Sequence, residues 1–169
     1  FGVDPAKNLF DIALAKGHMV RNAYWPISYP QMDVITAQNV CAHTPNPLDF
    51  LEGVQKALTV NGTAYIQTSQ SQMYQRNEFD TTYHEHISFF SVNSMMTLAD
   101  RVGLVLTDVQ ITPIHGDSYV FVLKHKGAEV QSSVKKMIKK EVEQGRHTQH
   151  FYKKFGNNAK NILTEFKGT

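Results

Sequence analysis

Short apolar runs alternate with stretches of helical spacing along the first third of the chain. Runs rich in apolar and β-branched residues predict strands, whereas apolar residues that recur every three or four positions predict helices. The predicted strands are residues 1–4, 18–25, 32–38 and 63–69, and the predicted helices are residues 5–16 and 47–58. Because strands that alternate with helices pair in parallel through crossover connections, this order predicts a parallel α/β sheet.

Polar residues and glycines mark the expected ends of these elements. Asp4 is placed to cap the first helix, which Gly17 then ends, and Asn46 is placed to cap the second. The pair Asn61-Gly62 predicts a turn before the strand that starts at residue 63.

The second half of the chain follows a different order. Residues 91–103 predict a capped amphipathic helix, and residues 104–114 and 118–125 predict two strands joined by a short turn, which favours antiparallel pairing. The fold class is therefore α/β, with a mixed sheet whose last strand is antiparallel. A helical segment follows from residue 128, although Gly145 and Gly156 argue against one unbroken helix.

Composition excludes several classes of protein. The chain has 169 residues, of which 41% are hydrophobic and 19% are charged, with a formal net charge of +2. This charge does not indicate nucleic acid or an anionic membrane as a partner, and the lysines near the C-terminus fit a solvated helix face. A single cysteine, Cys41, fits a reducing compartment, so we expect the cytoplasm. No segment has the roughly 20 apolar residues of a membrane helix.

The stretch "DTTYHEHISFF", residues 80–90, carries the strongest chemical signal. In a parallel α/β sheet, ligands bind beyond the carboxyl ends of the strands, where this stretch is predicted to lie. A helical turn would place Tyr83 and His86 on one face, and histidine suits proton transfer near neutral pH. Two other interpretations stay open: a metal site built on His84 and His86 with Glu85 or Asp80, and a polar surface turn.

Cys41 and His43 suggest a thiol nucleophile as a further alternative. No orienting acid is recognisable beside them, and a small buried thiol is the simpler interpretation.

Four segments in order resemble the sugar C-methyltransferases, which use S-adenosylmethionine to methylate a carbon of a nucleotide-linked keto-deoxysugar. They are "GVDPA", "DVITAQNVCAHTPNPLDFLEGV", "FDTTYHEHISFFSV" and "PIHGDSYVFV", so the resemblance runs from about Phe1 to Val122. Two segments depart from the family pattern. Gln67 and Ser69 replace an E-x-P segment, and Asp117 stands where a second glycine is common.

The resemblance implies a set of roles for individual residues. In the proton transfer, His86 would be the general base, Tyr83 a hydroxyl donor to an enolate oxygen, and Glu85 a support for a histidine, with His43 across the pocket. Asp4 would hold the ribose of S-adenosylmethionine, and Gln38 and Asn39 would border this cofactor. His115 and Ser118 would contribute to the sugar pocket, and no residue would bind a metal.

The resemblance also implies an incomplete sheet. Residues 1–127 would form a partial class I methyltransferase domain of Rossmann-like type that lacks the first core strand and its glycine-rich loop. That strand belongs between the strands at residues 1–4 and 32–38, and its absence would leave a gap of about 10 Å. We therefore expect a fragment of a longer protein, or a missing chain segment or second protomer that completes the sheet. Residues 128–169 would lead to an absent C-terminal domain.

The expected activity is C-methylation alpha to the carbonyl of the sugar, by proton abstraction and methylation of the enolate. A truncated or non-catalytic methyltransferase-like binding domain is the alternative.

Overall fold

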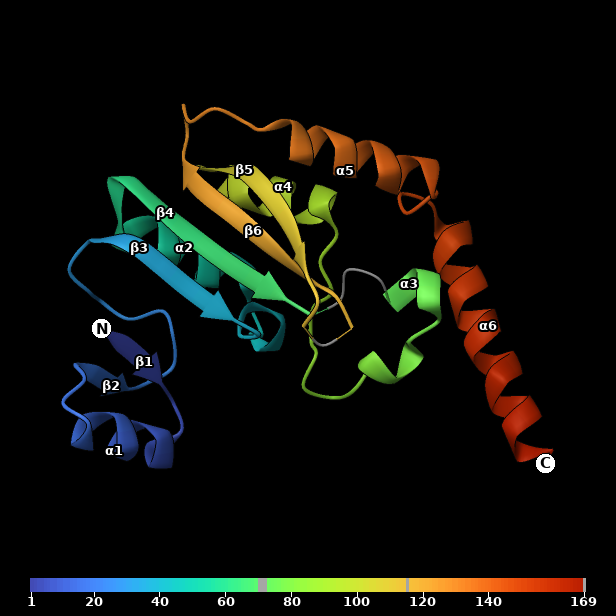
Figure 1. Ribbon diagram of the computed structural model, residues 1–169, viewed down its shortest axis with the longest axis horizontal. Helices are drawn as coiled ribbons and strands as arrows, with labels where there is room; N and C mark the ends of the chain where they lie inside the picture. The colour runs from blue at the N-terminus through green and yellow to red at the C-terminus, as the bar shows by residue number, and fades with distance from the viewer. Residues whose placement is uncertain (70–72, 115, 169) are drawn as a thin grey trace.

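A mixed four-stranded sheet forms the centre of the protein in a computed structural model that describes residues 1–69, 73–114 and 116–168 (Figure 1). Its strand order is β3-β4-β6-β5. The strands are β3 (Met32–Gln38), β4 (Leu58–Thr68), β6 (Ser118–His125) and β5 (Leu104–Thr112). β3 and β4 are parallel, whereas β6 is antiparallel to both β4 and β5. The predicted mixed sheet with antiparallel strands at its end is confirmed.

A second, smaller sheet carries the N-terminus. It pairs β1 (Gly2–Asp4) in parallel with β2 (Val20–Asn22), and α1 (Lys7–Ala15) connects the two strands. Figure 1 shows this unit apart from the main sheet, below β3. Within the described ranges β1 pairs only with β2, and β3 pairs only with β4. Direct pairing of β1 with β3 would have contradicted the expected gap, and it does not occur there.

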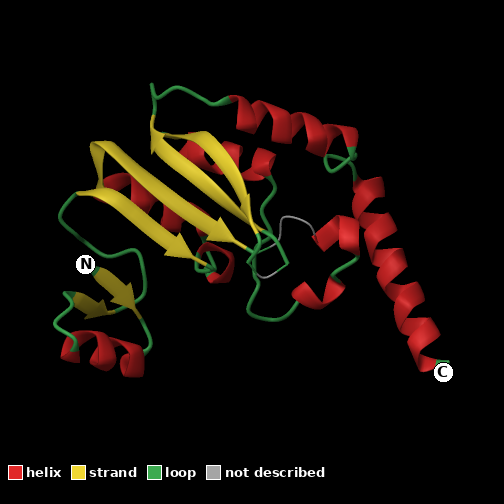
Figure 2. Ribbon diagram, viewed as in Figure 1, coloured by secondary structure: helices red, strands yellow, loops and turns green. Residues whose placement is uncertain are grey.

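One face of the main sheet is covered by α2 (Pro47–Ala57) and α4 (Val92–Arg101), which lie behind it in Figure 2. Side chains alternate along β4, so that Ala64 and Ile66 are fully buried under the helices while Tyr65 on the other face is partly exposed. The largest fully buried side chains are Leu51, Val54, Leu58, Ile66, Val92, Met95, Leu104, Leu106, Tyr119, Phe121 and Leu123. The opposite face is more open, and Val34 of β3 is 61% exposed.

Most predicted element ends agree with the structure. The side chain of Asn46 accepts a hydrogen bond from Leu48 N at 3.1 Å, as expected of a helix cap. Gly17 and Gly103 follow their helices with a φ of 80°, in the left-handed region that favours glycine. Ser91 and Ser94 form a reciprocal capping box at the start of α4.

Two local predictions were wrong. The first helix begins at Lys7, because Ala6 is still extended; Asp4 accepts from Ala6 N at 2.7 Å and stabilises the turn before the helix. Asn61 and Gly62 lie inside β4, where no turn starts. The pairing of β3 with β4 shifts from Met32–Leu58 to Val34–Thr63, so the additional residues of β4 are absorbed as a bulge.

The C-terminal segment forms two helices, α5 (Ser132–Glu143) and α6 (Gln149–Lys167). Gly145, with a φ of 76°, separates them, whereas Gly156 lies within α6 without interrupting it. α5 packs against β5 and α4, while α6 projects away from the sheet (Figure 1). The rings of Phe151 and Phe155 contact Tyr74 of α3 (Met73–Arg76). Across the part of the chain that the structure describes, no helix is sufficiently long and apolar to cross a membrane.

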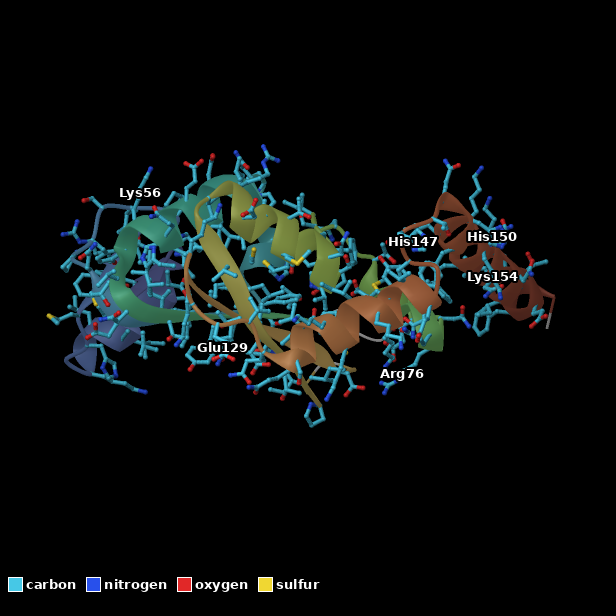
Figure 3. The ribbon with its side chains drawn as sticks, turned by 90° about the horizontal axis from the view of Figure 1, so that it is seen from above. Lys56, Arg76, Glu129, His147, His150 and Lys154 are labelled. Atoms are coloured by element: carbon cyan, nitrogen blue, oxygen red, sulfur yellow. The ribbon has the colours of Figure 1, made fainter. Side chains whose placement is uncertain are left out.

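Basic side chains cluster where α6 begins. Figure 3 shows His147, His150 and Lys154 at this end of α6, away from the sheet.

Candidate active site

The turn that contains Tyr83 and His86 lies beside the carboxyl end of β3. The backbone N–H groups of Ile87 and Ser88 both donate to the carbonyl of Ala42, at 2.9 and 3.0 Å. Ala42 belongs to the 3-10 helix η1 (Cys41–His43), which directly follows β3. The predicted motif is therefore fixed at the edge of the sheet where α/β proteins bind ligands.

A tight turn places the side chains of Tyr83 and His86 together, as predicted. His86 N donates to Tyr83 O at 3.0 Å, and the two ring centroids are 4.2 Å apart. The Nδ1 atom of His86 lies 2.8 Å from the carbonyl oxygen of Thr81. Because a carbonyl only accepts, Nδ1 carries the proton, and the neutral ring presents an unprotonated Nε2.

Two hydroxyl groups surround this Nε2 atom. The Tyr83 hydroxyl lies at 3.2 Å, and the Ser69 hydroxyl, just past the end of β4, lies at 3.4 Å. His86 is only 9% exposed and Ser69 only 7% exposed, whereas Tyr83 is 44% exposed. The potential base is therefore held in a buried position beside a hydroxyl that is accessible to a ligand.

His43 faces the same region and is held in the same way. Its Nδ1 lies 2.8 Å from the carbonyl oxygen of Glu85, so its Nε2 is also the unprotonated nitrogen of the neutral ring. The rings of His43 and His86 are 4.9 Å apart between centroids. The structure thus brings His43, Tyr83 and His86 together, and the family resemblance implied a shared pocket for these three residues.

These side chains line a cavity of about 320 Å³. Its other lining residues are Asn39, Ser69, Asp80 and Thr81. Asn39 has a φ of 52°, and its Oδ1 is buried without a hydrogen-bond partner among the described residues. Asn39 was predicted to border the cofactor, whereas Ser69 and Thr81 were not predicted as site residues. The position of Ser69 directly after a strand of the sheet was the signal that could have identified it.

Glu85 supports the site differently from the prediction. Its carboxylate points to solvent, with Oε1 3.8 Å from Nε2 of His84, and its backbone carbonyl, instead of its side chain, holds His43. His84 itself is exposed.

A second cavity, of about 400 Å³, lies between the small sheet and β3. Gln38 lines it, together with mainly apolar side chains such as Val3, Trp25 and Val34. Asp4 stands at the end of β1, where one carboxylate oxygen accepts from Ala6 N. The cofactor residues predicted from the sequence are thus divided between two cavities and two sheets.

Ser118, one of the two predicted substrate residues, is not among the described residues that line this cavity. Ser118 is fully buried at the start of β6, and its hydroxyl donates to the carbonyl of Ile114 at 2.8 Å. His115 lies outside the described residues. Ser118 therefore has a structural role in the turn between β5 and β6.

Two other chemistries were considered for this region, a thiol nucleophile at Cys41 and a metal site. Cys41 is fully buried, and burial raises the pKa of its thiol to about 12, so it stays protonated and is a poor nucleophile. In residues 1–69, 73–114 and 116–168, no group of three His, Cys, Asp or Glu side chains is arranged to hold a metal ion.

Comparison of sequences identifies related proteins. The C-methyltransferase NovU of Streptomyces niveus is 28% identical over 177 residues, a match that covers 98% of this chain and 42% of NovU. The chain thus spans less than half the length of this curated relative.

Comparison of structures gives the same fold. A SAM-dependent methyltransferase of Thermotoga maritima, described as a possible histamine N-methyltransferase, has a TM-score of 0.59 at 17% identity, over 75% of this chain and 73% of its own. Magnesium protoporphyrin IX methyltransferase of Synechocystis, solved with bound SAH, has a TM-score of 0.58 at 7% identity, over 74% and 63% of the two chains. The predicted class I methyltransferase fold is confirmed.

The family described as "Methyltransferase domain" matches residues 1–109, which include β1 to β4, the turn at Tyr83 and His86, and most of β5. This match supports S-adenosylmethionine as the cofactor. The chain therefore belongs to the methyltransferase domain family.

Proposed function

We propose that this chain carries the proton-abstracting part of an S-adenosylmethionine-dependent C-methyltransferase. Its substrate would be a nucleotide-linked keto-deoxysugar, methylated at the carbon alpha to the carbonyl. One observation carries the proposal: the carbonyl of Thr81 holds Nδ1 of His86, which leaves Nε2 beside the hydroxyl of the partly exposed Tyr83 in a cavity that both residues line. The similarity to NovU, a C-methyltransferase by its name, supports transfer to carbon.

The residues of the turn divide the chemistry between them. His86 Nε2 takes the proton alpha to the carbonyl, while the electron pair of the broken C–H bond forms the enolate. The Tyr83 hydroxyl donates a hydrogen bond to the enolate oxygen and so stabilises the charge that develops there. The His43 ring centroid lies 4.9 Å from that of His86, and the Glu85 carbonyl holds its Nδ1, so its Nε2 would be available to the substrate. Bound S-adenosylmethionine supplies the electrophilic methyl group.

Some residues of the chain fit the cofactor. Asn39 Oδ1 is a buried acceptor without a donor in the described structure, and it lines the cavity beside His86, so an amino group of a ligand would satisfy it. Asp4 has a carboxylate at the end of β1, and a carboxylate can accept from both hydroxyls of a ribose. Gln38 would border the cofactor from β3.

β1 and β3 belong to two separate sheets, and this separation affects the proposed cofactor site. We infer that a strand from a missing chain segment, or from a second protomer, pairs between β1 and β3, because both strands have an unpaired edge beside the same cavity. The same division favours the alternative that the isolated chain is a truncated or non-catalytic domain. Calorimetry with S-adenosylmethionine, on this chain and on a chain extended upstream, tests whether a missing strand is needed for cofactor binding. Binding by the extended chain alone supports the missing strand, whereas tight binding by this chain contradicts it.

Exchange of the α-hydrogen of the sugar with D₂O tests the base directly. In the longest chain that the gene encodes, His86→Asn should slow this exchange by about 10²- to 10⁴-fold, the usual contribution of a general base. His84→Asn is the matched control, because it changes a neighbouring histidine whose side chain is 89% exposed. Equal exchange rates in the two variants would remove His86 as the base.

Three further expectations stay predictions. The single buried cysteine supports a cytoplasmic location. Residues 1–127 would form the partial methyltransferase domain, and residues 128–169 would lead to a further domain, in keeping with the greater length of NovU.

A further inference from the structure

Two hydroxyl groups approach the same ring nitrogen of His86 from different elements. The Tyr83 hydroxyl comes from the turn and lies 3.2 Å from Nε2, while the Ser69 hydroxyl comes from the end of β4 and lies 3.4 Å away. An unprotonated Nε2 has one lone pair, so it accepts one well-formed hydrogen bond at a time. Both distances exceed the roughly 2.8 Å of a strong hydroxyl bond, so a small movement decides which hydroxyl is bonded.

The Tyr83 and Ser69 hydroxyls differ in how freely they can move away from Nε2 of His86. Tyr83 is 44% exposed, and its hydroxyl can rotate toward a ligand in the cavity. Ser69 is 7% exposed, and its short side chain is attached where the central strand β4 ends. The serine hydroxyl therefore stays within reach of Nε2 when the tyrosine hydroxyl moves away.

We propose that Ser69 is a positioning residue that shares the Nε2 atom of His86 with Tyr83 and releases the Tyr83 hydroxyl for the substrate oxygen. In the resting site either hydroxyl donates to Nε2. When the tyrosine hydroxyl turns to the substrate oxygen, Ser69 holds Nε2 in place until the serine O–H turns away and the α-proton of the substrate takes its position at the lone pair. After Nε2 has taken the α-proton, its N–H donates to the serine oxygen, which accepts once the hydroxyl has rotated. The catalytic consequence rests on the proposed function, whereas the sharing of Nε2 does not.

Nitrogen-15 NMR of the histidines in this chain tests the sharing without any substrate. His86 is assigned from the signal lost in His86→Asn. Because either hydroxyl can serve Nε2 alone, Ser69→Ala and Tyr83→Phe should each shift its resonance slightly, and the double variant should shift it by more than the sum. Ser133→Ala is the control, because this serine donates to the carboxylate of Asp108 outside the site. An Nε2 resonance that Ser69→Ala leaves unchanged in the Tyr83→Phe background overturns the proposal.

The rate of α-hydrogen exchange tests the catalytic consequence. Ser69→Ala should lower the turnover of exchange by about tenfold, the effect of one lost hydrogen bond, with KM unchanged. Ser69→Thr retains a hydroxyl and should restore most of the rate. Full turnover in Ser69→Ala contradicts a positioning role. If the unmodified protein catalyses no exchange, the proposed function fails, while the NMR result still decides whether the two hydroxyls share Nε2.

Discussion

Glu141 is a buried carboxylate that joins helix α5 to the first turn of α4. Its Oε1 accepts from Val92 N at 2.8 Å, and its Oε2 accepts from Asn93 N at 3.2 Å. Nη1 of Arg146, also buried, lies 3.6 Å from Oε1. The carboxylate therefore accepts from two N–H groups in the first turn of α4 that have no acceptor within the helix. Its negative charge also interacts favourably with the positive end of the helix dipole.

Replacing Glu141 with Ala should destabilise the chain strongly. The change removes two hydrogen bonds to a charged group and the carboxylate that faces Arg146, and it leaves the buried Val92 N without its acceptor. Breaking a buried ion pair of this kind costs about 3–5 kcal/mol of the free energy of unfolding. For a chain of this size, the melting temperature should fall by about 6–20 °C.

Urea unfolding followed by circular dichroism measures this loss. Glu143→Ala is the matched control, because Glu143 lies in the same helix, is exposed, and has only a 3.8 Å ion pair with Lys139. The control should lose about 0.5 kcal/mol or less. Glu141→Gln keeps an acceptor for Val92 N and should fall between the two. Equal losses in the two alanine variants would refute the reasoning, because helix propensity alone would then explain both.

Three other predictions concern separate parts of the fold. Cys41 should react with a thiol reagent only after unfolding; burial raises the pKa of its thiol from 9.0 to about 12, so the neutral thiol stabilises the fold below pH 9, and this stabilisation should disappear as the pH rises toward 12. Gly53→Ala should cost about 1–3 kcal/mol in urea unfolding despite the better helix propensity of alanine, because the added methyl would meet Pro26 and lie 3.0 Å from the ring of Trp25; a stabilised variant would contradict this contact. Asn46→Ala should lose about 1 kcal/mol by the same measurement, because it removes the cap of α2, and an unchanged stability would show that water replaces the cap.

The sequence predicted the main elements because their local signals agree with their packing. The spacing of Tyr83 and His86 predicted a turn, and the structure places both side chains on one side of it. The antiparallel pairing of β5 and β6 followed from the short connection between them. Gly145 ended a helix as expected because it adopts a positive φ, whereas Gly156 needed no such conformation and stayed within α6.

The contacts that orient the histidines were not predictable from residue types. Backbone carbonyls of Thr81 and Glu85 hold the two Nδ1 atoms, and every residue has a carbonyl, so the sequence carries no signal for this role. The family resemblance implied that Glu85 supports a histidine, and the structure gives its backbone carbonyl this contact with His43. The turn predicted at Asn61 and Gly62 was wrong for a related reason. Their preference for turns is a local property, whereas the bulge that they occupy is set by the pairing of β4 with β3.

The two halves of the proposed site differ in how the chain holds them together. His43 and His86 are fixed by carbonyls of residues 81–85, and the carbonyl of Ala42 ties this turn to the main sheet. Asp4 belongs instead to the small sheet, which forms no strand pair with β3 in the described residues. In the proposed mechanism, proton abstraction would therefore depend on one hydrogen-bonded unit, whereas methyl transfer would also depend on the position of a second. For this reason we expect changes between β1 and β3 to impair methyl transfer more than exchange of the α-hydrogen.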